Sequence, residues 1–191
     1  MQVLSVHHTF ARILVSTLVL LGAFSIVLIA EAAEVAVSPS TGSYGANQTF
    51  TVTIQANPQG KSINAVEAEL SFDKTKLSVV SVSKTGSAFS LWTTEPTFSN
   101  TAGTISFGGG SPSPFSTRSN LVSVTFRAVA EGSAAVTVTD ASVLAADGMG
   151  TDVYTAPVNG SYTVTAATAP TPTTPTSETP TAPAGTDSDT I

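Results

Sequence analysis

The chain has 191 residues, room for one domain of ordinary size with additional segments at its ends. Its formal net charge is −6 and 10% of its residues are charged, so it lacks the clustered Lys and Arg that phosphate binding needs, which argues against a nucleic-acid partner. Cysteine is absent, and the two histidines, His7 and His8, lie near the start of the chain. Without its N-terminus the chain has neither residue type, which excludes His-based triads, thiol nucleophiles and zinc or copper sites with N and S ligands.

Residues 1–33 have the pattern of an export signal. Arg12 supplies a positive charge, an apolar run extends from Ile13 to Ala30, and Ala30-Glu31-Ala32 has the small-x-small form of a cleavage site. The run of 18 residues is also just long enough to span a bilayer, so an uncleaved membrane anchor is the alternative. Both interpretations predict an N-terminal helix and place the domain outside the cytoplasm, either secreted or at the cell surface.

Residues 167–191 have a different composition from the rest of the chain. Pro, Thr and Ala dominate from Thr168 to Ile191, and no apolar periodicity is present. Such a segment cannot bury a core. We therefore expect a disordered Pro/Thr-rich linker or stalk.

Residues 34–166 contain short runs of alternating apolar and polar residues, separated by Gly, Pro and Asn. No segment keeps a helical period of 3.6 residues. This pattern predicts an all-β fold, an antiparallel β-sandwich or jelly roll of seven to nine strands. Two choices stay open, because either Val79 or Val80 continues the apolar phase of its strand, and either Val122, Val124 and Phe126 or their neighbours form that of another strand. The apolar phases lie at Phe50–Ile54, Val66–Phe72, Leu77–Val82, Ile105–Phe107, Val122–Phe126, Val136–Val138 and Tyr162–Val164.

Several segments in this region carry a family resemblance. A strand ends in the aromatic-Asp pair Phe72-Asp73, and a DKTK turn and a Val-rich strand follow it. Further matching strands come later in the chain. The segments, in order, are Ile63–Asp73, Asp73–Val82, Gly103–Phe107 and Leu121–Phe126, then Gly132 with a Val-rich strand. In this order they resemble the cohesin domain, the β-sandwich that docks dockerin modules in cellulosomes and on other bacterial or archaeal surfaces. The resemblance spans roughly Val35 to Thr165. It implies a protein–protein docking module with a dockerin-like partner, linked in many members to polysaccharide degradation.

Two other functions remain as alternatives. Carbohydrate-binding modules share the sandwich architecture, so a module that binds polysaccharide or adheres to a surface is the second hypothesis. A structural spacer of a surface protein is the third. An enzyme is not expected, because the chain without its N-terminus lacks the usual nucleophile–base pairs and has no insertion large enough to build a cleft.

Glu67 and Glu69 are the most conspicuous pair of ionisable residues. They lie two residues apart on a predicted strand, so they point to one face, about 6.5–7 Å apart. Glycosidase carboxylates have similar separations, but they flank a bond inside a cleft. Side by side on a sheet, the two glutamates fit a solvated face or a partner-contact surface better than a catalytic pair. The resemblance favours contact, because outward residues of this strand commonly meet the dockerin in that family.

The register of this strand follows from the cost of burying a carboxylate. A slip of one residue would place Glu67 and Glu69 in the core, which costs several kcal/mol for each unpaired charge. If Phe107 is in the core, its strand also presents small residues outward. Ala65 stands where cohesins often have a polar residue, which leaves the type of dockerin open. The candidate partner-binding residues are Ala65, Glu67, Glu69, Ser71, Ser106 and Gly108.

The remaining motifs have less specific interpretations. Asp147 and Asp152 in the segment DGMGTD are calcium candidates, but a Gly-rich turn explains the segment better, so no cofactor is expected. Gly108–Gly110 lacks the helix start and Lys of a phosphate-binding loop, which favours a flexible loop or a strand bulge. The aromatic residues that are candidates for stacking on sugars have no regular spacing; these candidates are Trp92, Phe115, Tyr44 and Tyr154. For Trp92, the single tryptophan, packing is the favoured role.

Overall fold

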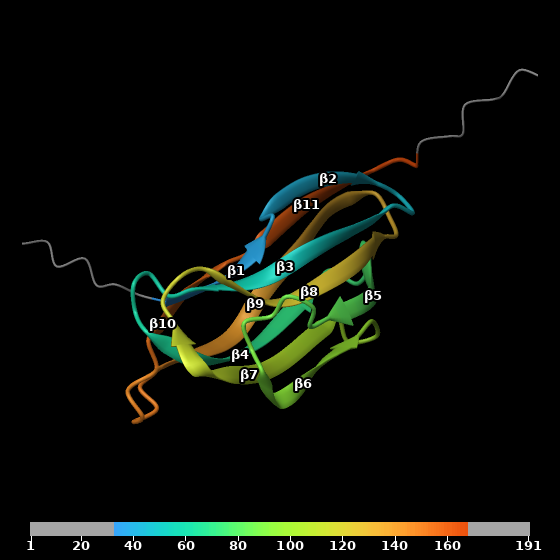
Figure 1. Cartoon of the computed structure of the whole chain (residues 1–191). Helices are drawn as coiled ribbons and strands as arrows, with labels where there is room; N and C mark the ends of the chain where they lie inside the picture. Colours follow the sequence, from blue (N-terminus) through green and yellow to red (C-terminus); the bar gives the residue numbers. More distant parts are fainter. Residues whose placement is uncertain (1–32, 168–191) are drawn as a thin grey trace, which may run out of the picture.

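The computed structural model describes residues 33–167, so the segments expected to be an export signal or anchor and a stalk lie outside the described residues except at their inner ends. Two β-sheets pack face to face over residues 33–167, and no helix occurs between them or at their edges within this range (Figure 1). The predicted all-β sandwich is confirmed. A helix with the length and hydropathy to cross a membrane is absent from this described range.

The sandwich has one sheet of five strands and one of six. In spatial order the first sheet consists of β10 (Tyr154–Val158), β1 (Ala33–Ser38), β3 (Thr49–Asn57), β8 (Ser119–Ala128) and β5 (Leu77–Ser83). The second consists of β2 (Thr41–Gly45), β11 (Gly160–Thr165), β9 (Gly132–Ala145), β4 (Ile63–Phe72), β7 (Thr104–Phe115) and β6 (Leu91–Ser99).

The described residues form eleven strands, more than the seven to nine expected, and two neighbouring pairs are parallel. The additional strands include β6 and β10, which lie at sheet edges and contain Pro96 and Pro157. An edge strand tolerates proline and exposes most of its side chains, so it lacks the alternation by which buried strands are detected. The parallel pairs, β1 with β10 and β2 with β11, arise because the first and last strands of the sandwich run side by side.

The apolar phases predicted from the sequence face the core. Every second residue is buried in β3 from Phe50, in β4 from Val66 and in β8 from Val122. The open choice in β5 is also settled. Val79 is 4% exposed and Val80 is 48% exposed, and a register shift between Val79 and Ser81 lies between them.

Aromatic residues fill one end of the core. Tyr44 stacks on Phe50 with ring centroids 3.8 Å apart, and Tyr162 lies against both rings. The hydroxyl of Tyr162 donates a hydrogen bond to the carbonyl oxygen of Pro39 at 2.7 Å. Burial raises the pKa of Tyr162, so its phenol stays neutral and its single donor is satisfied inside the core. Tyr162 thus ties β11 to the turn between β1 and β2.

Candidate functional site

Strand β4 has the register that the cost of burying its glutamates predicts. Val66, Ala68 and Leu70 are at most 2% exposed. Glu67 and Glu69 are exposed on the opposite face of the sheet. Ala65 and Ser71 lie on this same outward face and are half-buried.

The outward side chains of β9, β4, β7 and β6 form rows that cross the four strands, and we call the surface made by these rows the four-strand face. We name the rows by their chemistry, and successive rows are about 7 Å apart along the strands. From one end of the strands to the other, the apolar row is Leu144, Ala65, Gly110 and Leu91; the first acidic row is Ser142, Glu67, Gly108 and Thr94; the second acidic row is Asp140, Glu69, Ser106 and Thr97; the hydroxyl row is Thr137, Ser71, Thr104 and Ser99.

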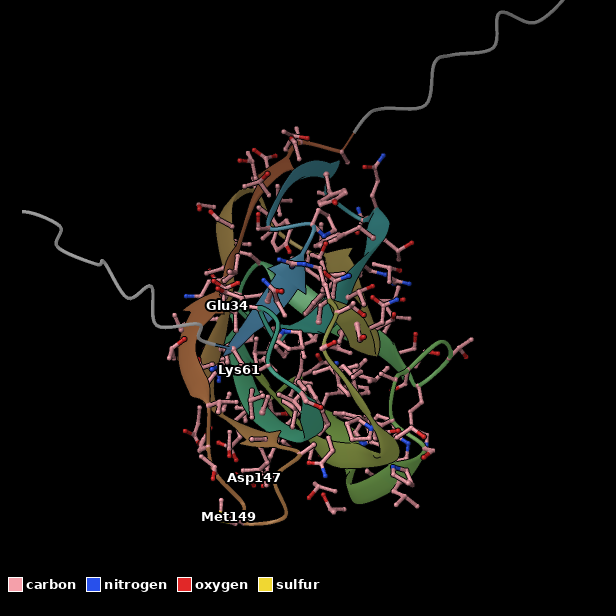
Figure 2. The ribbon with its side chains drawn as sticks, turned by 60° about the vertical axis from the view of Figure 1, so that its left-hand side comes forward. Glu34, Lys61, Asp147 and Met149 are labelled. Carbon is pink, nitrogen blue, oxygen red and sulfur yellow. The ribbon has the colours of Figure 1, made fainter. Side chains whose placement is uncertain are left out.

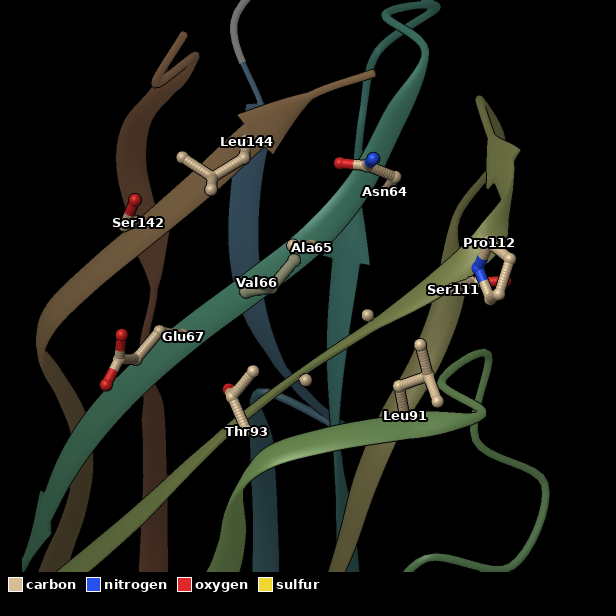
Figure 3. Close-up of a pocket in the computed structure, with 12 residues that line it drawn as sticks. Asn64, Ala65, Val66, Glu67, Leu91, Thr93, Ser111, Pro112, Ser142 and Leu144 are labelled. Carbon is tan, nitrogen blue, oxygen red and sulfur yellow. The ribbon is translucent and has the colours of Figure 1, made fainter. Parts of the chain in front are cut away.

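A hollow of about 540 Å³ lies over the apolar row (Figure 3). Leu144 on β9 and Leu91 on β6 stand at its two sides, and Ala65 and Gly110 form its floor. Leu91 is 59% exposed, although leucine is usually buried. The hollow exists because the two central strands carry small residues where the two outer strands carry leucines.

The acidic rows contribute three carboxylates and no cation. Glu67, Glu69 and Asp140 are all exposed, and none of them forms a salt bridge with another residue of the described range. A salt bridge between Lys84 Nζ and Glu95 Oε2 at 2.7 Å lies outside these rows. None of the sixteen residues in the four rows is Lys or Arg. The four-strand face therefore carries three negative charges.

The two candidates on β7 differ in how accessible they are. Ser106 lies beside Glu69 and shares a hydrogen bond with the hydroxyl of Thr97 at 3.0 Å. Gly108 lies beside Glu67, but it is buried rather than accessible, since Thr93 Oγ1 is 3.0 Å from the position of a Cβ atom there. Gly108 therefore keeps this part of the surface low and offers little contact area of its own.

The glycine run is part of strand β7. Gly108, Gly109 and Gly110 pair with β4 and β6, so the flexible-loop interpretation is wrong, but the β6–β7 pairing has a register shift between Trp92 and Thr94, opposite Gly109 and Gly108, as the bulge alternative predicts. The irregular part of the β4–β7 pairing comes after the run, between Gly110 and Phe115. Small residues are needed here because the neighbouring strands approach closely; a Cβ on Gly110 would lie 2.6 Å from the carbonyl oxygen of Asn64.

Leu91, Asp140 and Leu144 are among the residues of the four-strand face that were not found from the sequence. Leu91 lies on the edge strand β6, which the alternation does not reveal. Asp140 and Leu144 follow a register shift in β9 opposite Glu69 and Leu70, which exposes both Thr139 and Asp140 and changes the phase. A bulge of this kind gives no signal in a single sequence.

The two calcium candidates hold a loop together. The carboxylate of Asp147 accepts hydrogen bonds from the Met149 N–H at 2.8 Å and from the Thr151 hydroxyl, and these lower its pKa. Burial alone would raise the pKa of Asp152, but hydrogen bonds from the Tyr154 and Val143 N–H groups outweigh the effect of burial, so the pKa is lowered. Figure 2 shows the loop with Asp147 and Met149 projecting from the sandwich. Within residues 33–167 no three His, Asp or Glu side chains gather as a metal site.

The candidate aromatic residues pack rather than form a sugar platform. Trp92 is half-buried, with its ring edge-on to Phe89 at 5.4 Å and Lys84 Nζ 5.2 Å from its centroid. The other candidates also pack partly against the core; they are Tyr44, Phe115 and Tyr154. No flat row of exposed rings for stacking on pyranoses occurs among them.

Several solved structures of cohesins are similar to this chain. The chain is similar to a cohesin from Clostridium acetobutylicum, with 22% identity and a TM-score of 0.56 over 71% of this chain and 92% of that one. A type I cohesin from Pseudobacteroides cellulosolvens matches at 22% identity and a TM-score of 0.56, over 73% and 95%. A non-cellulosomal cohesin from the archaeon Archaeoglobus fulgidus matches at 18% and 0.55, over 71% and 92%. At these levels of identity, the structural similarity shows a shared fold.

Family membership comes from the sequence itself. A comparison with curated proteins gives no match. The family model of the cohesin domain matches residues 34–164, which is more than half of the chain and includes β4 and all of the four-strand face. The chain belongs to the cohesin family.

Proposed function

We propose that this protein is a non-catalytic docking module that binds a dockerin through the four-strand face. The single observation that carries the proposal is the composition of that face. It holds three unpaired carboxylates and a hollow between Leu91 and Leu144, on a sheet that is otherwise covered by small side chains. Charge without an internal counterion, next to an exposed apolar depression, is typical of a surface that a partner completes.

The family supports the choice of partner. Some similar solved structures are cohesin–dockerin complexes, including one from Clostridium thermocellum with a TM-score of 0.59 and 12% identity. We infer that the partner of this chain is likewise a dockerin module. The N-terminal apolar run and the Pro/Thr-rich C-terminal segment support a place outside the cytoplasm, secreted or at the cell surface. Enzymes of polysaccharide degradation are the class of dockerin carrier that we expect there.

The test measures dockerin binding by a charge-reversed face. Glu67→Lys combined with Glu69→Lys changes two exposed side chains, so the midpoint of thermal unfolding should move by only a few degrees. Binding of the full chain to dockerin modules of the producing organism, measured by calorimetry, should weaken at least tenfold, which is about 1.4 kcal/mol.

A matched control places lysines elsewhere on the same sheet. Ser161→Lys with Thr163→Lys introduces two lysines two residues apart on the outward side of β11, outside the four-strand face. This variant should bind as the wild type does. Unchanged dockerin affinity in the folded glutamate variant would refute the proposal, and loss of polysaccharide binding on Trp92→Ala would support the carbohydrate-binding alternative instead.

A further inference from the structure

The chain contains two segments of the form Asn-x-Ser/Thr, the pattern in which asparagine accepts an N-linked glycan in exported proteins. Asn47–Thr49 leads from β2 into β3, and Asn159–Ser161 leads from β10 into β11. The pattern arises easily by chance in a chain rich in Ser and Thr. The structural setting of each segment therefore decides whether its asparagine is a site of modification.

The two groups that define the pattern are accessible in the first segment. Asn47 and Thr49 are both exposed, and neither the carboxamide of Asn47 nor the hydroxyl of Thr49 has a hydrogen-bond partner within residues 33–167. Gln48, between them, holds the turn instead, since its Oε1 accepts a hydrogen bond from the Gly45 N–H at 2.8 Å. The turn keeps its shape without using the asparagine side chain, so the Asn47 Nδ2 is free to react.

The backbone of this segment has a strand on one side only. The Asn47 N–H donates to the carbonyl oxygen of Ala128 at 2.8 Å, and the Ala128 N–H donates to the carbonyl oxygen of Gln48 at 2.9 Å. On the other side of β3, pairing with β1 ends at Thr53, before the turn is reached. The segment thus lies at the end of the sandwich, where an enzyme can approach it in the folded protein (Figure 1).

The second segment is built into the six-stranded sheet. The Oδ1 of Asn159 accepts a hydrogen bond from the Val138 N–H at 3.0 Å, so this carboxamide satisfies a backbone donor of β9. Gly160 is buried, and a Cβ there would lie 2.5 Å from the hydroxyl oxygen of Tyr162. Ser161 pairs with β9 on one side and with β2 on the other. An enzyme could bind this segment as an extended peptide only by opening two strand pairings.

We propose that Asn47 carries an N-linked oligosaccharide and that Asn159 does not. The donor is an oligosaccharide joined through C1 of its first sugar to a polyprenyl phosphate or pyrophosphate, and the catalyst is an oligosaccharyltransferase. The Asn47 Nδ2 bonds to C1 and gives one proton to a base of the enzyme. The C1–O bond breaks, and the lipid phosphate leaves with the electron pair. The inference rests on the place outside the cytoplasm that is proposed above, because such transferases act on exported chains.

A glycan on Asn47 would be remote from the four-strand face. The Ala46 N–H donates to the Thr165 carbonyl oxygen at 2.8 Å, so the turn adjoins the end of β11 (Figure 1). There β11 pairs with Gly132 at the start of β9, whereas the hollow lies beside Leu144 near the other end of β9. These two ends of β9 are roughly 35–40 Å apart along the strand. The modification thus leaves the proposed docking surface accessible.

The experiment is peptide mass spectrometry of the full chain recovered from the producing organism, with the cytoplasm analysed separately from the membrane and the medium. Trypsin cleaves after Lys61 and after Arg127, so the two asparagines fall in different peptides. We expect the mass of an oligosaccharide on the peptide that ends at Lys61, located at Asn47 by electron-transfer fragmentation. We expect Asn159 to be unmodified.

Variants of the first segment test whether the pattern itself is read. Asn47 has a φ of 70°, a region in which Asn and Asp are both favoured, so Asn47→Asp removes the acceptor nitrogen and keeps the turn. Thr49→Val removes the hydroxyl and keeps the branched shape of the side chain. Both variants should lose the glycan, whereas Thr49→Ser should retain it.

A variant of the second segment tests its structural role. Asn159→Ala should leave the glycan on Asn47 in place and lower the midpoint of thermal unfolding by several degrees, because the Val138 N–H loses its acceptor. A midpoint unchanged by Asn159→Ala would contradict the role assigned to this carboxamide.

The outcomes separate the inference from the location on which it rests. Chain recovered outside the cytoplasm with Asn47 unmodified, or with the glycan on Asn159 instead, would overturn the inference and leave the proposed location standing. Glycan retained in Thr49→Val would also overturn it, since the pattern would not be what the enzyme reads. Chain recovered only from the cytoplasm, without a glycan, would overturn both.

Discussion

Glu69 on β4 lies directly opposite Asp140 on β9, so two carboxylates occupy one cross-strand position. Both side chains are exposed, and neither has a salt-bridge partner within residues 33–167. Like charges placed directly opposite each other destabilise a sheet. The pair therefore weakens the free protein, and a cationic partner would relieve the repulsion.

Removing one charge of this pair should stabilise the fold. We expect Asp140→Asn to raise the free energy of unfolding by about 0.2–1 kcal/mol in buffer of low ionic strength, and by less in about 1 M salt because of screening. Urea denaturation at the two salt concentrations measures both values. Glu131→Gln, at an exposed position outside the four rows, is the control and should change neither value appreciably. If Asp140→Asn lowered the free energy of unfolding, or raised it in high salt as much as in low salt, repulsion between the two carboxylates would not be the cause.

Asn100 links the turn after β6 to the edge strand β5. Its Oδ1 accepts from the Val79 N–H at 2.7 Å, and its Nδ2 donates to the Val79 carbonyl at 3.0 Å. The side chain thus makes both hydrogen bonds that a neighbouring strand would make. Asn100→Ala should lower the free energy of unfolding by about 1–3 kcal/mol, because two part-buried backbone groups lose their partner.

A graded variant tests this interpretation. Asn100→Asp keeps the acceptor for the Val79 N–H and removes the donor to its carbonyl. Its stability, measured by the same denaturation, should fall between those of the wild type and Asn100→Ala. Equal losses in the two variants would indicate that the donor alone matters, and no loss in either would refute the link.

The sequence predicts those parts of the fold where burial alternates strictly. The register of β4 follows because Glu67 and Glu69 cannot both be buried without partners. The phases of β3 and β8 follow because apolar residues such as Phe50 and Val124 recur at every second position and face the core. The edge strands β6 and β10 could not be predicted, because exposed strands with proline carry no alternation.

The candidate surface was predicted in its centre and missed at its margins. The central outward residues share one strand with a clear phase, as Ala65 and Glu67 do. Leu144 and Asp140 lie beyond a register shift, which changes the phase of β9. The order of the strands in the sheet, which places β9 beside β4, is a property of the topology and cannot be read from one segment. The hollow depends on small residues of two strands lying between leucines of two others, a relation that no single segment contains.

Gly110 and Gly108 should differ in their tolerance of a methyl group. A Cβ on Gly110 would lie 2.6 Å from the backbone oxygen of Asn64, whereas a Cβ on Gly108 would meet the Thr93 hydroxyl oxygen, a side-chain atom that can move, at 3.0 Å. We expect Gly110→Ala to lower the free energy of unfolding by about 1–3 kcal/mol through overpacking. Gly108→Ala should cost clearly less in the same thermal and urea measurements. Equal costs would show that the backbone contact at Gly110 is no harder to relieve than the side-chain contact at Gly108.

Hydrogen-bonded aspartates should make the fold sensitive to acid. The side-chain hydroxyl and the N–H of Thr75 bind the Asp73 carboxylate at 2.6 and 2.9 Å, and they lower its pKa. Burial opposes ionisation of Asp152, yet the N–H groups of Tyr154 and Val143 bring its pKa below the ordinary value of 3.8. Because each folded-state pKa lies below the unfolded one, the unfolded chain binds more protons in this range.

The stabilisation from these aspartates is complete above the unfolded pKa of about 3.9 and is lost as the pH falls through the folded values. The midpoint of thermal unfolding should therefore change little between about pH 7 and pH 5 and fall below about pH 4. Asp152→Asn keeps an oxygen that accepts from the two N–H groups but cannot titrate, so its midpoint should fall less between pH 7 and pH 3 than that of the wild type. Calorimetric scans of both proteins measure the difference. An identical fall in the two proteins would show that the Asp152 carboxylate contributes nothing to the acid sensitivity of the fold.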